Sequence, residues 1–174
     1  MRQQNFGSAE ERAAQFLYLN RTCWNGLYRV NRKGEFNVPK GTKSTVVLPN
    51  DDFPAVSEAL QSAALLCCDF EDAIRVAEAG DLVYIDPPYT VQHNFNGFLK
   101  YNEKIFSWHD QIRLRDAVVA ASDRGARIVV SNAAHQSVVD LYAGVGTMHV
   151  IQRSSKLAAD SSRRGVVDEI MVIV

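Results

Sequence analysis

A short apolar run, Leu82 to Ile85, stops at two consecutive prolines, and no other feature restricts the fold of this chain as strongly. Short runs of this kind are typical of a buried strand in a parallel sheet. Pro87 and Pro88 fix two φ angles and remove two backbone N–H donors, so the strand ends abruptly. The sequence therefore predicts a strand that leads into a stiff turn.

Helical and strand patterns alternate along the rest of the chain. Helices are expected over residues 9–20, 55–62, 71–79, 107–123 and 134–142, and strands over residues 64–68, 81–85, 126–130, 148–152 and 166–174. Ser107 and Asp110 resemble a capping box at the start of one helix, and Gly125 follows its end. Strands that alternate with helices predict an α/β layered sheet, and the last two strands are a plausible antiparallel pair.

Charge is distributed unevenly. The 174 residues carry a formal net charge of -1, with 47% hydrophobic and 22% charged residues, which excludes global disorder and a uniformly basic surface. Residues 21–43 nevertheless hold six basic residues and one acid, and residues 44–81 hold eight acids and one base. A basic segment beside an acidic one indicates a polyanion-facing element attached to an ordinary domain, although a solvated basic loop explains the charge equally well.

The remaining composition gives expectations about compartment and metals. Three cysteines and four scattered histidines predict neither a disulfide framework nor a zinc site. No apolar run approaches the ~20 residues that span a bilayer. A polar N-terminus without the apolar core of a signal peptide then favours a cytoplasmic protein with no membrane partner.

The segment Asp86-Pro87-Pro88-Tyr89 carries the most specific chemistry. An exocyclic NH2 group on a planar ring can donate one hydrogen to the Asp86 carboxylate and one to the Pro87 carbonyl, while the ring stacks on Tyr89. These hydrogen bonds favour a more tetrahedral nitrogen and free its lone pair for attack, and they stabilise the developing positive charge. Asp86 and Asn132 each follow a predicted strand, where ligands of α/β sheets bind. No metal is required.

The same segment resembles motif IV of amino-group methyltransferases that use S-adenosylmethionine. Three upstream segments look like the target-recognition segment of the DNA adenine-N6 methyltransferase family of the Dam type (D12 class): Leu17–Arg21, Trp24–Asn31 and Gly34–Gly41. Downstream similarity is found at Tyr101, Phe106, Ser131, Asn132 and Val167-Asp168-Glu169. The resemblance covers nearly the whole chain.

This resemblance implies a partial Rossmann-like sheet with an N-terminal DNA target-recognition segment over residues 1–55, and the C-terminal part of the catalytic domain over residues 56–174. It also implies methyl transfer from S-adenosylmethionine to N6 of an adenine flipped out of double-stranded DNA, in a phage, restriction-modification or housekeeping setting. Asp86 would contact both the cofactor and the target amine. Tyr89 would stack on the adenine.

Residues of the recognition segment are assigned to DNA by the same resemblance. They are Trp24, Asn25, Leu27, Arg29, Asn37, Pro39 and Lys40. Arg29 would read a guanine edge through O6 and N7, Leu27 and Pro39 would make apolar base contacts, and the target would be GATC-like. Asn25 could bond an unpaired base, and Trp24 could enter the base stack. The basic side chains of Arg21, Arg32, Lys40 and Lys43 would hold phosphates.

One family feature is missing from the sequence. The Phe-x-Gly-x-Gly cofactor fingerprint is not found, and Gly144-Val145-Gly146 lies between a predicted helix and a strand, which is the wrong context. We therefore expect a truncated sheet with an unpaired edge and weak or no catalysis by this chain alone, unless a second chain supplies the missing N-terminal half. The alternatives are a non-catalytic DNA-binding remnant or subunit and a cytosine-N4 DNA methyltransferase.

Overall fold

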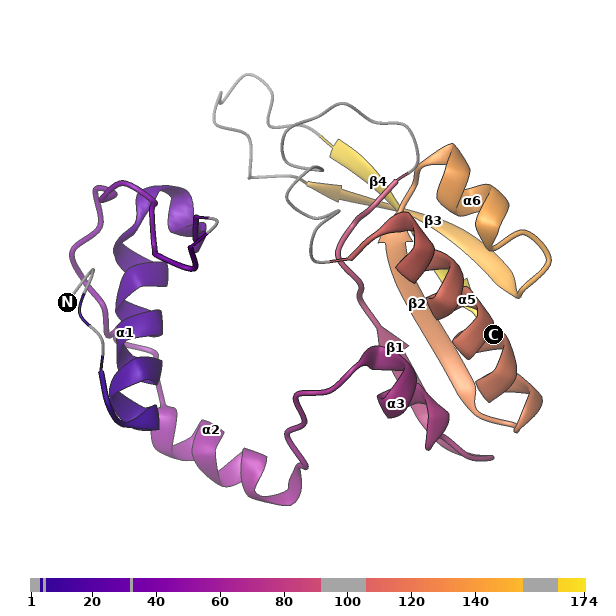
Figure 1. Cartoon of the computed structure of the whole chain (residues 1–174), viewed down its shortest axis with the longest axis horizontal. Helices are drawn as coiled ribbons and strands as arrows, with labels where there is room; N and C mark the ends of the chain where they lie inside the picture. The colour runs from indigo at the N-terminus through magenta and orange to yellow at the C-terminus, as the bar shows by residue number, and fades with distance from the viewer. Residues whose placement is uncertain (1–3, 5, 32, 92–105, 155–165) are drawn as a thin grey trace. The chain divides into compact units, whose positions relative to one another are not determined.

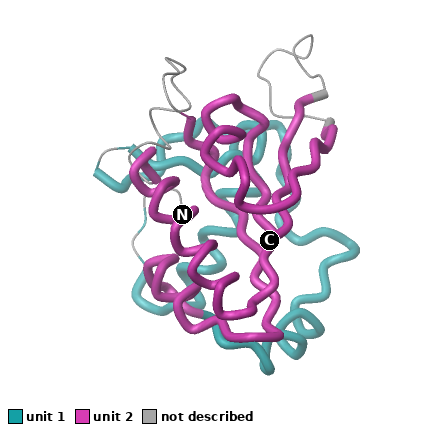
Figure 2. The backbone as a smooth tube through the Cα atoms, turned by 90° about the vertical axis from the view of Figure 1, so that its right-hand side faces the viewer, with its two compact units in different colours: residues 1–65 teal, residues 66–174 magenta. Residues whose placement is uncertain are grey.

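The structure is a computed structural model that describes residues 4, 6–31, 33–91, 106–154 and 166–174 (Figure 1). Two compact units divide the chain between Leu65 and Leu66 (Figure 2). The first unit holds the basic segment and the second holds the Asp-Pro-Pro-Tyr segment.

The first unit is organised by one helix. Helix α1 (Ala9–Thr22) is preceded by the N-cap residue Ser8, which forms a reciprocal capping box with Glu11 and so satisfies two backbone donors. A single 3-10 turn, η1 (Trp24–Gly26), follows α1, and α2 (Phe53–Ala59) and η2 (Leu60–Ser62) lie near the end of the unit. The helix predicted over residues 9–20 is confirmed.

The irregular segment between η1 and α2 is tied to α1 by aromatic contacts and a small core. Tyr28 lies between Phe16 of α1 and Phe36, with ring centroids 4.8 and 5.2 Å away. Leu19 of α1 and Val38 of this segment are buried. These contacts give a defined shape to a stretch that has little regular secondary structure.

The second unit contains a four-stranded mixed sheet with strand order β1-β2-β4-β3. Its strands are β1 (Leu82–Ile85), β2 (Arg127–Ala133), β3 (Thr147–Ser154) and β4 (Val166–Ile173). Strand β1 runs parallel to β2, whereas β4 is antiparallel to both β2 and β3. The predicted α/β sheet and its C-terminal antiparallel pair are confirmed.

Three helices pack with the sheet to form the hydrophobic core of this unit: α3 (Phe70–Arg75), α5 (Trp108–Asp123) and α6 (Gln136–Leu141) (Figure 1). Helix α5 has the predicted capping box of Ser107 and Asp110, and Gly125, with a φ of +94°, takes the left-handed conformation after its last turn. One sheet face packs against these helices through the buried side chains Ile128, Val130, Ile170 and Val172.

Three expectations need correction. The strand predicted over residues 64–68 is wrong: Leu65 and Leu66 are 76% and 75% exposed, and no strand is assigned there. The helix predicted over residues 71–79 ends at Arg75, because the Arg124 side chain donates to the carbonyls of Ile74 and Ala77 at 3.0 and 2.9 Å and caps the helix early.

Strand β1 is also less buried than predicted. Val83 and Ile85 pack against the core, but Leu82 and Tyr84 are 71% and 62% exposed. Successive side chains of a strand point to opposite faces, so the face of β1 opposite the helices is open in the described part of the chain. The strand is parallel, as expected, and half-buried.

Candidate functional site

The Asp-Pro-Pro-Tyr segment leaves the sheet at the carboxyl end of β1, beside the parallel strand β2. Asp86 and Pro88 are exposed, Pro87 is buried, and Tyr89 is partly buried. The buried proline anchors the turn while the carboxylate faces solvent. An acceptor and an aromatic ring are thus presented together at the sheet end where α/β proteins bind ligands.

The Tyr89 hydroxyl is held by polar groups of two strands. It donates to the Glu169 carboxylate of β4 and accepts from the Ser131 hydroxyl of β2. Burial, the bond to Glu169 and the negative charges of Glu169 and Asp86 together raise the pKa of Tyr89 to about 12, against the opposing effect of Ser131. The phenol therefore stays neutral at physiological pH and its ring is fixed against the sheet.

Glu169 is itself part of a cross-strand arrangement. It lies opposite Ala133 on β2 and Ile151 on β3. Arg153 on β3 pairs with its carboxylate through Nη2. The C-terminal hairpin thereby braces the aromatic ring of the Asp-Pro-Pro-Tyr segment through charge and hydrogen bonding.

In the first unit, the turn containing Trp24 lies beside the segment around Pro39. Trp24 N–H donates to the Pro39 carbonyl at 2.9 Å, and Cys23 forms an isolated antiparallel bridge with Lys40. Gly41 permits this approach, because a Cβ there would lie 2.6 Å from the Cys23 carbonyl oxygen. The two predicted DNA-contacting segments around Trp24 and Pro39 are therefore neighbours.

The side chains on this turn are available to solvent. Trp24 is 52% exposed, and Asn25 and Gly26 adopt left-handed φ angles of 55° and 67°. Leu27 is partly buried. The exposed indole on a tightly turned backbone is unusual for a large aromatic side chain, which is ordinarily buried in a core.

Arg29 and Asn37 are paired across a short antiparallel arrangement. Asn37 N–H donates to the Arg29 carbonyl at 3.2 Å, and Arg29 Nε donates to Asn37 Oδ1 at 3.1 Å. Asn31 closes the connection by accepting from the N–H groups of Lys33 and Glu35. The guanidinium of Arg29 is thus exposed, and its Nε contact orientates it.

Arg21, which is predicted to hold a phosphate, is engaged by other groups of the first unit. Its guanidinium forms a two-pronged ion pair with Asp51, with Nη2 at 2.9 Å from Oδ1, and also donates to the Val46 carbonyl. The hydrogen bonds from Arg21 lower the pKa of Asp51. Lys40 and Lys43 are exposed, whereas Arg32 and Tyr101 lie outside the described residues.

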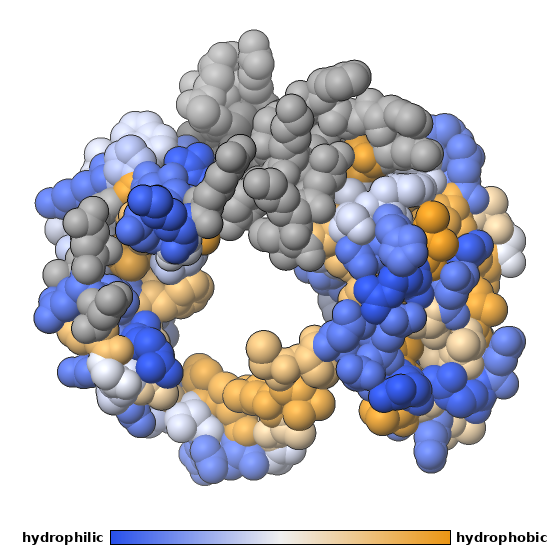
Figure 3. All heavy atoms as spheres, in the orientation of Figure 1, coloured by the Kyte–Doolittle hydropathy of each residue, from blue (hydrophilic) through white to orange (hydrophobic). Residues whose placement is uncertain are grey.

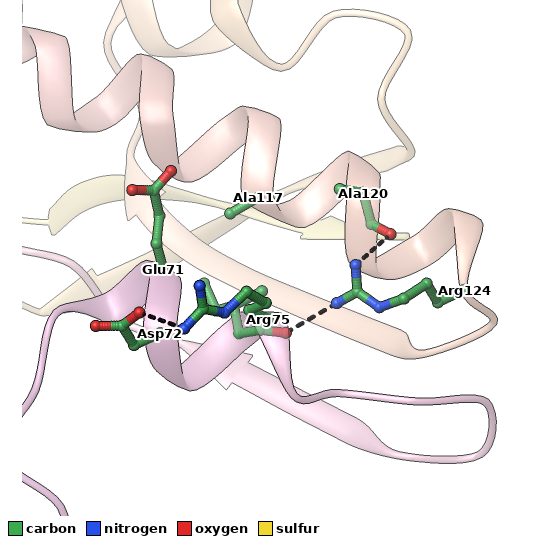
Figure 4. A pocket seen from close by; sticks show the side chains of 7 residues that line it. Glu71, Asp72, Arg75, Ala117, Ala120 and Arg124 are labelled. Atoms are coloured by element: carbon green, nitrogen blue, oxygen red, sulfur yellow. Dashed lines mark hydrogen bonds and ion pairs between the residues drawn. The ribbon is translucent and has the colours of Figure 1, made fainter.

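A surface pocket of about 290 Å³ lies between α3 and α5 and contains none of the predicted site residues. Its charged side chains are already engaged: Arg75 pairs with Asp72, and Arg124 donates to backbone carbonyls, including that of Ala120 (Figure 4). Within the described residues, no group of three metal-ligating side chains is found, and none of the helices there is long and apolar enough to cross a membrane.

Sequence reasoning missed the polar side chains beneath the Asp-Pro-Pro-Tyr segment. Thr90 and Gln111 are fully buried, and neither is among the residues that the sequence motifs indicate. A signal for Gln111 existed: it shares the buried stripe of α5 with Leu114, Val118 and Ala121, so an amide occupies a core position. For Ser131 and Glu169 the sequence indicates a family resemblance but no role.

Comparison with known proteins gives a family match over most of the chain. Residues 2–156 match the family model described as D12 class N6 adenine-specific DNA methyltransferase. A type II methyltransferase, M1.LlaDCHI of Lactococcus lactis subsp. cremoris, is 38% identical over 168 residues. The type II methyltransferase M.MjaIII of Methanocaldococcus jannaschii is 35% identical over 165 residues, and the DNA adenine methylase of Escherichia coli K12 is 30% identical over 162 residues.

These alignments include 95%, 94% and 93% of this chain but only 59%, 57% and 58% of the respective relatives. The chain therefore spans little more than half the length of the curated relatives that it matches. The resemblance first based on Asp86–Tyr89 and the recognition segments is confirmed at the level of the family.

Proposed function

Because the chain belongs to the D12 class N6 adenine-specific DNA methyltransferase family, we propose that it takes part in methyl transfer to N6 of adenine in double-stranded DNA. The observation that carries the proposal is the turn after β1. It presents the exposed Asp86 carboxylate beside the partly exposed Tyr89 ring. Both groups suit a planar ring with an exocyclic amine, which a duplex exposes only when the base is flipped out.

The proposed chemistry uses this chain's own acceptors. The Asp86 carboxylate and the Pro87 carbonyl accept the two hydrogens of the adenine amine, and Tyr89 stacks on the ring. The amine nitrogen becomes more nucleophilic because its lone pair is drawn out of conjugation. Positive charge that develops on this nitrogen is stabilised by the Asp86 carboxylate, and such preorganised charge is usually the largest contribution to catalysis.

We propose S-adenosylmethionine as the methyl donor; when bound, it supplies an electrophilic methyl group. Asp86 is the residue of this chain that would hold it, because its exposed carboxylate at the carboxyl end of β1 can accept from an amine or hydroxyl donor. The parallel pairing of β1 with β2 supports a Rossmann-like arrangement for this part of the sheet.

The first unit is proposed as the target-recognition segment. Exposed Trp24 would enter the base stack, and Asn25, Leu27 and Pro39 would contact bases. Arg29 would donate to O6 and N7 of a guanine in a GATC-like target. The Asn37 contact at 3.1 Å supports this role, because it orientates the guanidinium. Lys40 would contact a phosphate.

We further propose that activity requires a complement, defined here as a polypeptide equivalent to the part of the Lactococcus lactis relative that this chain does not match. It would be supplied by the same polypeptide or by a second chain. Two observations support it: the open face of β1 at Leu82 and Tyr84 in the second unit, and the exposed apolar side chains of Leu60 and Leu65 in the first unit, along and after α2 (Figure 3). Exposed apolar surface that gathers in a patch is typical of an interaction site.

The test is a methylation assay with radiolabelled S-adenosylmethionine and duplex DNA with and without GATC sites, using the chain alone and the chain mixed with the complement. We expect little incorporation by the chain alone, and N6-methyladenine in the digested product when the complement is present. The Asp86→Ala variant should reduce incorporation at least about 100-fold, within the range for loss of a transition-state contact.

Other outcomes would replace the proposal. N4-methylcytosine in the product would favour a cytosine-N4 DNA methyltransferase. Duplex binding with no affinity for S-adenosylmethionine, measured by equilibrium dialysis with and without the complement, would favour a non-catalytic DNA-binding subunit. Full turnover by the chain alone would reject the need for a complement while leaving the reaction intact.

A further inference from the structure

Gln111 is a polar side chain in the core whose role the proposed reaction does not explain. It lies in the first turn of α5 and has no exposed surface. Its neighbours along the buried stripe of the helix, Leu114, Val118 and Ala121, are apolar. Burying an amide costs free energy unless its hydrogen bonds are satisfied. The hydrogen-bond partners of Gln111 therefore indicate its structural role.

The amide bridges the end of β2 and the Asp-Pro-Pro-Tyr segment. Gln111 Nε2 donates to the Thr90 carbonyl at 3.2 Å, and Asn132 Nδ2 donates to Gln111 Oε1 at 3.1 Å. Asn132 Oδ1 in turn accepts from the Ala133 N–H at 2.9 Å. Gln111, Asn132 and Thr90 are all buried.

Only one orientation of the two amides satisfies this chain of bonds. The Thr90 carbonyl can only accept, so Nε2 of Gln111 must face it and Oε1 must face Asn132. The Ala133 N–H can only donate, so Oδ1 of Asn132 must face it and Nδ2 must face Gln111. The backbone at both ends therefore fixes a directional bridge from Ala133 to Thr90.

This bridge holds the proposed base-binding turn at its second end. At the first end, Ile85 is paired with Val130 of β2. At the second end, the Thr90 carbonyl is tied through Gln111 to Asn132, two residues further along β2, and the Thr90 hydroxyl donates to the Phe106 carbonyl at 2.6 Å. The segment from Asp86 to Tyr89 is thus anchored to β2 at both of its ends, at Val130 and at Asn132.

We propose that Gln111 is a positioning residue: by fixing the Thr90 carbonyl, it sets the geometry of the Asp86 carboxylate and the Tyr89 ring toward a nucleobase. The inference rests on the proposed function for its catalytic consequence, but not for the rigidity of the turn. These two parts are separated by the experiment, which measures each of them.

The first variant is Gln111→Met, which keeps a similar side-chain length and removes both hydrogen bonds. The matched control is Leu114→Met, a volume-conserving change in the same buried stripe that removes no polar contact. Hydrogen exchange of the full chain, followed by mass spectrometry, reports on the peptide containing residues 86–91. We expect its exchange to rise about tenfold or more in Gln111→Met only, equivalent to about 1.4 kcal/mol of lost local protection, with β2 and β4 unchanged.

A second variant, Gln111→Glu, keeps the proposal testable if the first does not fold. The introduced carboxyl can replace both amide bonds only when protonated, because its O–H then donates to Thr90 while its carbonyl oxygen accepts from Asn132. Burial raises the pKa of such a carboxyl. Protection of residues 86–91, corrected for intrinsic exchange chemistry, should therefore match the parent chain at low pH and be lost at high pH.

The catalytic consequence is measured in a methylation assay that contains both the chain and the complement. Gln111→Met should lower kcat about tenfold or more while KM for duplex DNA changes less than about threefold, since an interaction acting in the transition state is lost. Three results would each overturn the positioning role. They are equal exchange of residues 86–91 in Gln111→Met and the Leu114→Met control, a rise in exchange across the whole sheet, and protection in Gln111→Glu that does not depend on pH. Absence of methylation in every protein, with the exchange result intact, would instead overturn the proposed function.

Discussion

Tyr89 combines a partly exposed ring with a hydroxyl that is fixed by Glu169 and Ser131. Its pKa is raised from 10.0 to about 12, so the folded chain holds the phenol proton more tightly than the unfolded chain does. The stabilisation is therefore complete below about pH 10 and is lost as pH rises through about 12.

This linkage predicts the behaviour of Tyr89→Phe, which keeps the ring and removes the hydroxyl. The difference in the free energy of unfolding between the parent chain and the variant should be constant from pH 7 to pH 9. Between pH 10 and pH 12 the parent should lose stability relative to the variant. Urea titrations followed by circular dichroism measure both; a difference that is flat across the whole range would contradict the hydroxyl contacts.

Arg21 and Lys40 are both basic residues of the proposed recognition segment, but their environments differ. Arg21 is engaged by Asp51 and the Val46 carbonyl, whereas Lys40 is exposed. Lys40→Ala should therefore reduce the slope of log affinity for duplex DNA against log salt concentration by about 0.9, the value for one lost phosphate contact.

The matched variant Arg21→Ala should leave that slope unchanged and instead lower thermal stability, because Asp51 loses its partner. Fluorescence anisotropy with a labelled duplex gives the slopes. A reduced slope in Arg21→Ala at unchanged stability would show that the ion pair opens to contact DNA.

Among the elements, those with local signals were predictable and those set by distant contacts were not. Ser107 and Gly125 mark the ends of α5 within a few residues of sequence, and both act as expected. The end of α3 depends on Arg124, nearly fifty positions away, whose donors take the carbonyls of Ile74 and Ala77. No local pattern in α3 contains that information.

In the candidate site, too, the features with a local sequence signal were predictable and those set by distant contacts were not. The stiff turn at Asp86 to Tyr89 is encoded by two adjacent prolines and was predictable. Its support by Gln111 was not, because a glutamine in a helix pattern does not reveal which backbone carbonyl it will meet. Likewise, the Tyr89 contact with Glu169 depends on where β4 enters the sheet.

The capping box of α5 offers an element-scale prediction. Ser107→Ala should lower the free energy of unfolding by about 1 kcal/mol at pH 7. The hydrogen bonds from Ser107 lower the pKa of Asp110, so this contribution is present above the ordinary carboxyl pKa and is lost as pH falls through the lowered value. The cost should therefore shrink in acid.

Urea unfolding at pH 7 and pH 3 measures this dependence. Ser122→Ala, which removes a hydroxyl at the other end of α5, is the control and should cost little at either pH. An equal cost of both substitutions would contradict a capping role for Ser107.

At the scale of the whole molecule, the sheet has two edge strands of different character. Strand β3 is long and carries polar residues such as Gln152 and Arg153, which discourage pairing with another chain. Strand β1 is short, with Leu82 and Tyr84 exposed. Since the chain matches less than three fifths of its relatives' length, β1 is the edge along which we place the complement.

The substitution Tyr84→Lys tests that placement, with Val150→Lys on β3 as its control because the two side chains are 62% and 66% exposed. In the chain alone, both should change the free energy of unfolding by no more than about 0.5 kcal/mol, as is usual at exposed positions. A lysine buried beneath the complement loses hydration, so Tyr84→Lys should weaken association about tenfold or more, whereas Val150→Lys should not. Isothermal titration calorimetry measures the dissociation constants. Equal effects of both substitutions would place the contact elsewhere, and an absence of binding by the parent chain would reject the complement itself.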